Sequence, residues 1–171
     1  MTRIGLLSDT HGFLDKKILK YFEDCDEIWH AGDFGNLEVA NQLSDWKPLR
    51  GVYGNIDAHN LRNRYPLDQQ FTLEGLNIYI THIGGYPGRY DRRVSQILHN
   101  CTPHLFVCGH SHILKVMKDP AYNNMLVLNP GAAGIVGFHK FRTVLRFCLN
   151  RGKIQNLEAI QLGKRSDIGV L

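Results

Sequence analysis

The stretch VCGHSHI, Val107 to Ile113, places two histidines two residues apart, directly after a glycine that closes an apolar run. Four other apolar runs end in a similar way, with aspartate, asparagine or histidine at or just beyond their last residue. These endings are Asp9 and His11 after IGLLS, Asp33 after EIWHAG, Asn55 after GVYG, and His82 after NIYIT. Open α/β sheets place their sites at the carboxyl ends of strands. The five endings therefore indicate both the fold class and the position of the site.

The order of the segments predicts a mixed α/β fold. In the first half, the β-branched runs IGLLS, EIWHA and PLRGVY alternate with helical periods at 14–22 and 37–43, as in parallel βαβ units. NIYIT, a helix near 90–99 and HLFVC follow. In the second half the helices stop, and the runs ILKVMKD, NMLVLN, RTVLRFCLN and KIQNLEAIQL predict strands. The last two strands join at Asn150-Arg151-Gly152 in a hairpin. We expect two sheets packed face to face, with helices outside.

Composition narrows the class of protein. The 171 residues with 43% hydrophobic content fit one globular domain, 1–163, followed by a tail, 164–171, that has no periodicity and is expected to be loose. No apolar run approaches the roughly 18–20 residues that span a bilayer, and Asp9 comes too early for a signal peptide, so we expect a cytoplasmic protein. Four cysteines without a CxxC pair predict free thiols. The net charge of +4 is scattered and does not by itself indicate nucleic acid.

The spacing of the polar endings favours a metal site. In an extended segment, residues i and i+2 face the same side, so Asp9 with His11, and His110 with His112, would each direct both side chains into one site. A single aspartate at a strand end is more often a helix cap or turn former. Five endings drawn from aspartate, asparagine and histidine are harder to explain in that way. Glycines border these endings and would allow sharp turns or close approach of the backbone: Gly12, Gly32, Gly54 and Gly109.

At this point the motifs resemble those of a known family. The five-block signature of the calcineurin-like metallophosphoesterases is similar to Asp9-x-His11, Gly32-Asp33, Gly54-Asn55-x-Asp57, His82 and Gly109-His110-x-His112. The short length and Asn129-Pro130-Gly131 resemble the small bacterial and archaeal phosphodiesterase subgroup. The resemblance spans Ile4 to Phe147. It implies a four-layer αββα sandwich of two mixed β-sheets flanked by helices, with a dinuclear metal centre at the carboxyl edges of the sheets.

The resemblance also implies ligands, cofactors and a reaction. One metal would be held by Asp9, His11, Asp33 and His112, and the second by Asp33 as a bridge together with Asn55, His82 and His110. Two divalent ions are implied, and mixed nitrogen and oxygen ligation favours manganese, with iron, zinc or nickel as alternatives. A hydroxide bridging the two ions would attack a phosphodiester in line.

Further residues are candidates for roles around the metals. Asp57 would orient a ligand histidine, or alternatively cap a turn. In many phosphatases of the wider family a histidine follows the asparagine ligand and protonates the leaving group, whereas this chain has Ile56. His59 and His139 are candidate replacements, although a surface or core histidine is the ordinary interpretation of each. Asn55, and Arg89 after the IGGYPG loop, are candidates for contacts with the substrate; the alternative for Arg89 is a solvated helix face.

Two rival functions stay open at this point. The first is a non-catalytic metal-binding scaffold, because the small phosphodiesterases resemble a subunit of the retromer coat; all seven ligand positions are filled here, which argues against it. The second is a phosphomonoesterase or nucleotide phosphatase, against which Ile56 argues. The expected partner is a small phosphodiester substrate and not a membrane. A nucleic acid is not excluded but not favoured, because basic and aromatic residues do not interleave. The sequence does not decide whether the protein forms a homo-oligomer.

Overall fold

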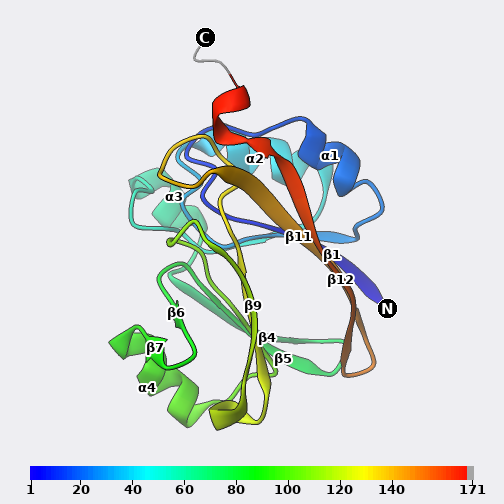
Figure 1. The fold of residues 1–171 in the computed structure, drawn as a ribbon, viewed down its shortest axis with the longest axis vertical. Coiled ribbons are helices and arrows are strands. Elements are labelled where there is room, and N and C mark those ends of the chain that lie inside the picture. Colours follow the sequence, from blue (N-terminus) through cyan, green and yellow to red (C-terminus); the bar gives the residue numbers. More distant parts are fainter. Residues whose placement is uncertain (169–171) are drawn as a thin grey trace.

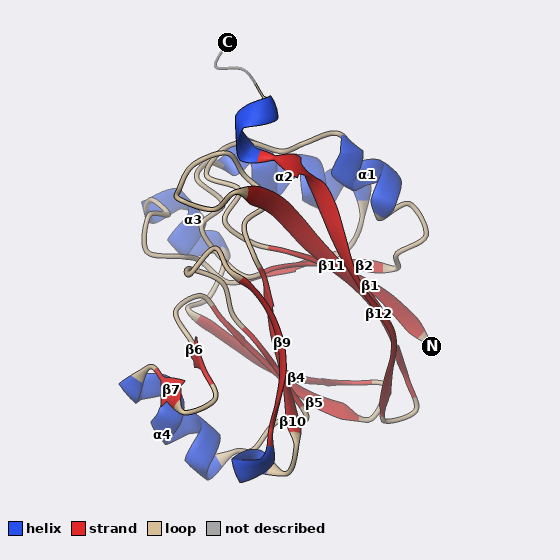
Figure 2. Ribbon diagram, viewed as in Figure 1, coloured by secondary structure: helices blue, strands red, loops and turns tan. Residues whose placement is uncertain are grey.

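The computed structural model describes residues 1–168, and their elements form four layers (Figures 1 and 2). Two five-stranded sheets pack against each other, and helices lie on both outer faces. Among the described residues, no helix combines the length and the apolar character needed to cross a membrane. The expected mixed α/β sandwich is confirmed, with the two sheets forming its inner layers.

The first sheet combines the start of the chain with its end, in the order β12-β11-β1-β2-β3. Three neighbouring strands are parallel, and the two long strands from the end of the chain pair antiparallel beside them. The strands are β1 (Thr2–Leu7), β2 (Glu27–His30), β3 (Leu49–Gly51), β11 (Phe141–Asn150) and β12 (Lys153–Lys164). The expected hairpin joins the last two strands around Arg151.

The second sheet has the order β4-β5-β8-β10-β9, with three parallel strands in the middle and an antiparallel strand at each edge. Its strands are β4 (Asp68–Leu73), β5 (Leu76–Thr81), β8 (Leu105–Val107), β9 (Leu114–Asp119) and β10 (Met125–Pro130). A separate ribbon consists of β6 (Gly85–Tyr86) and β7 (Arg89–Tyr90). The strands of the second half favour antiparallel pairing in the sequence, and β10 is indeed antiparallel to β9, but it is parallel to β8 on its other side.

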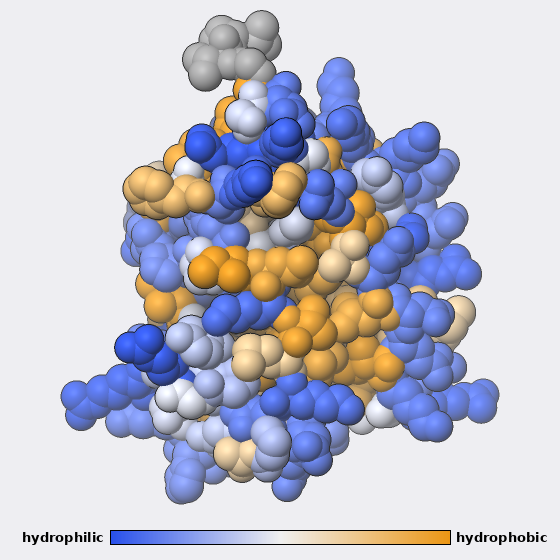
Figure 3. All heavy atoms as spheres, in the orientation of Figure 1, coloured by the Kyte–Doolittle hydropathy of each residue, from blue (hydrophilic) through white to orange (hydrophobic). Residues whose placement is uncertain are grey.

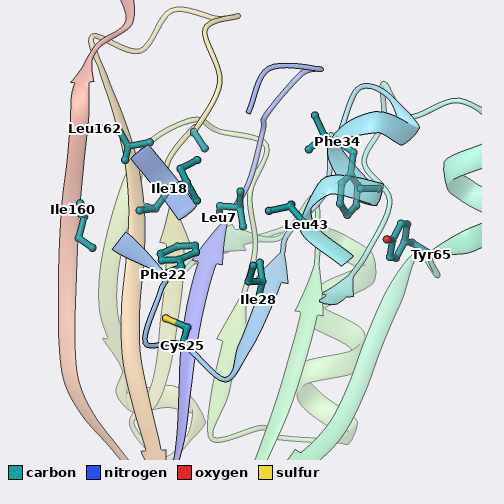
Figure 4. Packing of buried hydrophobic residues seen from close by; sticks show 14 of the residues in the cluster. Leu7, Ile18, Phe22, Cys25, Ile28, Phe34, Leu43, Tyr65, Ile160 and Leu162 are labelled. Atoms are coloured by element: carbon teal, nitrogen blue, oxygen red, sulfur yellow. The ribbon is translucent and has the colours of Figure 1, made fainter. Parts of the chain in front are cut away.

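The helices divide between the two outer faces. Those packed on the first sheet are α1 (Lys17–Tyr21), α2 (Leu37–Trp46) and α3 (His59–Arg64), and α4 (Arg92–Asn100) covers the second. Two single turns of 3₁₀ helix complete the structure, η1 (Pro120–Tyr122) and η2 (Arg165–Asp167). Figure 4 shows Ile18 and Phe22 of the α1 region lying against Leu7 and Ile28 of the first sheet.

Alternation along the strands separates the three hydrophobic clusters. In β8, Leu105 and Val107 enter the cluster between the two sheets, whereas Phe106 packs against α4 with Val94 and Leu98. Full burial of each such side chain contributes roughly 1.5–3 kcal/mol. Because both faces of the central strands are buried, the strands are fixed in register and their carboxyl ends meet at one edge.

The structure also differs from the sequence interpretation in α1 and at the end of β12. The helix expected over 14–22 is the shorter α1, and residues 164–168, expected to begin a loose tail, complete β12 and form η2. The backbone amide of Arg165 donates to the carbonyl of Lys140 (3.0 Å), which fixes this end beside β11. Residues 169–171 of the expected tail lie outside the described residues. The four cysteines are free, as expected.

Candidate metal centre

The polar strand endings converge at the edge where the two sheets meet. Their side chains form two adjoining groups, in each of which one ligand atom per residue lies within 4.8 Å of the others. The groups are Asp9, His11 and His112, and Asp33, His82 and His110. The amide oxygen Oδ1 of Asn55 lies 3.1 Å from Nε2 of His82, which places Asn55 beside the second group. All seven residues expected from the sequence are therefore brought together.

The backbone reaches this arrangement by turns that the sequence interpretation did not include. Five of the seven residues have a left-handed backbone, with φ of 54° at Asp9, 47° at His11, 57° at Asp33, 65° at His110 and 57° at His112. A left-handed backbone costs a residue other than glycine roughly 1–2 kcal/mol. The expected extended geometry is therefore wrong. Strained backbone concentrated at one cluster of polar side chains is typical of a functional site.

Backbone hydrogen bonds between the strand-end loops maintain the strained turns. The amide of Asp9 donates to the carbonyl of Gly32 (3.0 Å), and the amide of His11 donates to the carbonyl of Asp33 (3.1 Å). The amide of His110 donates to Oδ2 of Asp9 (3.1 Å) and so joins the second sheet to the first. Each ligand loop is thus fixed by another ligand loop.

Two glycines allow these loops to approach closely. A Cβ atom at Gly54 would overlap the carboxylate of Asp33, and one at Gly109 would overlap the Ser8 hydroxyl and crowd Oδ2 of Asp9. Neither glycine has positive φ, so the requirement is for space and not for a special backbone conformation. The sequence analysis expected glycines beside the ligands, and the structure gives this physical reason for two of them.

Asp57 has contacts different from those expected. Its carboxylate accepts hydrogen bonds from the amides of Gly35 (2.8 Å), Gly54 (2.8 Å) and Phe34 (3.2 Å), and no histidine in the described part of the chain contacts it. The residue therefore joins the loop after Asp33 to the loop that precedes Asn55. These contacts agree with the alternative expectation, that Asp57 caps a turn, and give no support to its orienting a ligand histidine.

The two carboxylates of the cluster, Asp9 and Asp33, are buried among imidazoles. Asp9 is fully buried, and among the described residues its Oδ1 has no hydrogen-bond partner, although Nε2 of His112 lies 3.1 Å away. Burial opposes ionisation of Asp9, but the imidazoles of His11 and His112 outweigh it and hold its pKa well below the usual range. At Asp33, burial is likewise outweighed by His82, 3.2 Å away, and the pKa is lowered. Two anionic carboxylates among imidazole nitrogens form a donor set that fits a divalent transition metal.

Two imidazoles have a ring orientation that directs Nε2 into the centre. Nδ1 of His82 lies 2.7 Å from the carbonyl oxygen of Ala31 and donates to it, so the neutral imidazole has its lone pair on Nε2. Nε2 of His139 donates to the carbonyl of Gly134 (3.0 Å), so its Nδ1 accepts from Nδ1 of His112 (3.3 Å). This contact favours the tautomer of His112 that carries its hydrogen on Nδ1 and its lone pair on Nε2. Such partners commonly fix the tautomer of a metal ligand.

The other expected residues lie outside this cluster. His59 begins α3 and Arg89 lies in β7; both are exposed, and neither lines the clefts beside the ligand groups. Both ring nitrogens of His139 are engaged, by Gly134 and by His112, so we expect it to position His112; its role as a replacement general acid stays a prediction.

The sequence places His30 in a strand next to Trp29 and favours a packed or supporting residue, and the structure agrees. This buried histidine stacks on Phe34 and contacts the Thr10 hydroxyl (3.0 Å), while its Nδ1 accepts from the amide of Gly32 (3.2 Å). Burial lowers its pKa to about 3, so it is a neutral support for both ligand loops. His30 is the last residue of β2, directly before Ala31. The only feature of the sequence that indicated its burial was the alternation along this strand.

Replacement of His139 tests the positioning role. We expect His139→Ala to weaken divalent metal binding by roughly 10–100-fold, because His112 loses the partner that fixes its tautomer. Isothermal titration calorimetry with Zn²⁺ measures this change. His59→Ala is the matched control and should leave affinity unchanged. Unchanged affinity in His139→Ala, combined with a loss of hydrolysis, would instead support a general acid at this position.

Metal binding should depend on pH through the imidazoles. The pKa of His11 is raised mainly by the carboxylate of Asp9, 3.8 Å from its Nε2, and that of His82 is raised because Asp33 and Asp9 outweigh burial. A bound metal needs neutral imidazoles, so binding must displace protons near and above pH 6.5. Affinity should therefore rise with pH through this range, whereas the carboxylates are already ionised. Calorimetry at pH 7 in buffers of different ionisation enthalpy would count the released protons; zero release would contradict this expectation.

Comparisons with known proteins agree with this geometry. Residues 2–152 match the calcineurin-like phosphoesterase superfamily domain. A protein of Methanocaldococcus jannaschii named as a probable metallophosphoesterase is 29% identical over 135 residues, covering 75% of this chain and 67% of that protein. One solved structure, titled as a novel archaeal phosphodiesterase, has a TM-score of 0.74 at 21% identity and covers 94% of this chain and 99% of its own.

The Vps29 protein of Chaetomium thermophilum has a TM-score of 0.73 at 15% identity, with 96% of each chain covered. At these identities the two structures show the fold alone. The match over residues 2–152 covers most of the chain and confirms the resemblance found in the motifs. The chain therefore belongs to the calcineurin-like phosphoesterase superfamily, a family of metal-dependent phosphoesterases.

Proposed function

We propose that this chain hydrolyses phosphodiesters at a centre of two divalent metal ions, with manganese as the favoured metal. The observation that supports this is the pair of adjoining ligand groups. Oδ2 of Asp33 lies 3.7 Å from Nε2 of His11 and 3.2 Å from Nε2 of His82, between the two groups. Asp33 would be shared by two ions; the remaining ligands would be Asp9, His11 and His112 for one ion, and Asn55, His82 and His110 for the other.

The bound ions would acidify a water molecule as the nucleophile and neutralise charge on the phosphate. The chain's own residues prepare the centre for this. Asp9 and Asp33 stay ionised at neutral pH. The carbonyl of Ala31 and the ring of His139 direct the Nε2 lone pairs of His82 and His112 inward. The left-handed loops keep these groups in place before substrate arrives, which lowers the cost of ordering them.

The residue after Asn55 favours a diester. Ile56 is 47% exposed beside the centre, and its only polar contribution is a backbone amide that donates to Oδ1 of Asp33 (3.1 Å). In many phosphatases of the wider family a histidine at this position supplies the proton for the leaving group. Loss of a general acid costs on the order of 10²–10⁴ in rate unless the leaving group is a weak base. The departure is shared with the small phosphodiesterase subgroup, and the archaeal phosphodiesterase has the same fold.

Paired chromogenic esters test this proposal. Manganese-reloaded protein should hydrolyse bis-p-nitrophenyl phosphate faster than p-nitrophenyl phosphate, and removal of metal by a chelator should abolish the rate reversibly. Asp33→Asn should lose more than about 100-fold, because it removes the shared ligand charge and not merely a supporting contact. Asp45→Asn, an identical change at an exposed position of α2, is the matched control.

Two outcomes would contradict the proposal. A monoester rate above the diester rate would indicate a phosphomonoesterase. Metal binding without turnover of either ester would indicate a protein that uses the centre for binding alone.

A further inference from the structure

The candidate metal centre lies between two clefts. The first cleft, of about 480 Å³, shares His11, His110 and His112 with the ligand groups. The second, of about 280 Å³, shares Asn55 and His82 with them. A phosphodiester carries two ester groups on one phosphorus atom. A phosphate held at the centre would therefore direct its ester groups toward these clefts.

The outer wall of the first cleft is apolar and uncovered. Ile113 is 56% exposed, Val136 is 51% exposed and Phe138 is fully exposed. Single exposed apolar side chains are ordinary on a protein surface, but three around one cleft mark a surface that a ligand or partner covers. No carboxylate, lysine or arginine lines this cleft within the described residues, and its polar groups are the imidazoles and Ser111.

The loop that carries Phe138 is attached to the metal centre itself. It connects β10 to β11, and the amide of Gly134 donates to the carbonyl of Asp9 (3.1 Å). Nε2 of His139 donates to the carbonyl of Gly134 (3.0 Å), which closes the loop on either side of Phe138. Phe138 is thus presented beside the ligands by a segment fixed at both ends.

The second cleft has a different chemistry. It is lined by the charged side chains of Arg62, Arg93 and Asp91, together with Tyr53 and the exposed apolar side chains of Leu67 and Ile83. The guanidinium of Arg62 donates to the carbonyls of Asp57 (2.7 Å) and Asn55 (2.9 Å) and lies over the Tyr53 ring. The second cleft therefore offers charged side chains to an ester group, whereas the first, on the side of Phe138, offers an apolar wall and imidazoles.

We infer that the first cleft binds a flat aromatic group esterified to the phosphate, and that Phe138 is a residue that determines this specificity. The inference deepens the proposed function and rests on it. The cleft shares ligand residues with the centre, so a group that occupies it is only a few bonds from the phosphorus. An exposed phenyl ring favours another ring in offset or edge-to-face contact. The aromatic ring could belong to an aryl ester or to a nucleobase.

Binding of phosphate diesters to zinc-loaded protein tests the inference, since Zn²⁺ is diamagnetic and permits NMR titration. Diphenyl phosphate and dimethyl phosphate carry the same charge and differ only in their ester groups. Wild-type protein should bind diphenyl phosphate more tightly. Phe138→Ala should lose about tenfold of that preference, and its affinity for dimethyl phosphate should stay the same. Because Phe138 is fully exposed, its removal does not disturb the core.

A matched pair of variants controls for the loss of apolar surface. Val136→Ala should weaken diphenyl phosphate binding, whereas Val116→Ala, the same change at a similarly exposed position (45%) on β9, should not. Thymidylyl-thymidine identifies the source of the ring: a Phe138-dependent affinity for it indicates a nucleobase, and an effect confined to diphenyl phosphate indicates an aryl ester.

The inference is overturned if Phe138→Ala binds diphenyl phosphate as tightly as wild type, or if the two valine variants lose affinity equally. Such a result would indicate that the apolar wall of the first cleft binds a protein partner instead of an ester group. Binding is measured without turnover, so the two proposals fail separately. A wild-type protein that shows the Phe138-dependent preference but hydrolyses neither chromogenic ester would overturn the proposed function alone.

Discussion

Two carboxylates are buried where the carboxyl ends of the two sheets meet, and the surrounding structure compensates their charge. Asp9 is fully buried and Asp33 is 2% exposed. An ionised carboxylate in such a position costs several kcal/mol unless opposite charge lies beside it. The contacts that lower the pKa of these carboxylates raise the pKa of His11 and His82. Protons on imidazoles therefore compensate the centre when no metal is bound, and divalent cations are suited to replace them.

The sheet topology explains why these charges can be held together. The parallel strands β1 and β2 deliver Asp9 and Asp33 from the first sheet, and β5 and β8 deliver His82 and His110 from the second. The buried cluster between the sheets fixes the distance between the two sets of strand ends. On the outside, hydrophobic surface lies over and between β9 and β12, the edge strands that both face the viewer in Figure 3.

Most of the fold and the positions of the ligands were predictable from the sequence, because buried strands and polar strand ends leave a pattern in residue type. The backbone conformation of the strand-end loops was not predictable. The left-handed φ of a residue such as His11 follows from tertiary hydrogen bonds that the sequence does not show. Strand β4 was missed because its segment, DQQFTL, is largely polar, as an edge strand permits. Asp57 contacts backbone amides, and His139 contacts a backbone carbonyl and the ring of His112, which is 27 residues away in the sequence. No spacing of residues in the sequence indicates these contacts.

Charge and shape select different parts of a substrate at this site. In the proposed centre, two divalent ions would exceed the charge of the two carboxylates, because amide and neutral imidazole ligands would add none. The loaded centre would therefore keep an excess of positive charge that favours any phosphate ester. That attraction does not distinguish one ester from another. The distinction must come from the cleft walls, where Ile113, Val136 and Phe138 present apolar surface on one side and arginines line the other. An exposed phenyl ring contributes no packing to the folded chain, so a fixed loop that presents it beside the centre is better explained by contact with a ligand than by stability.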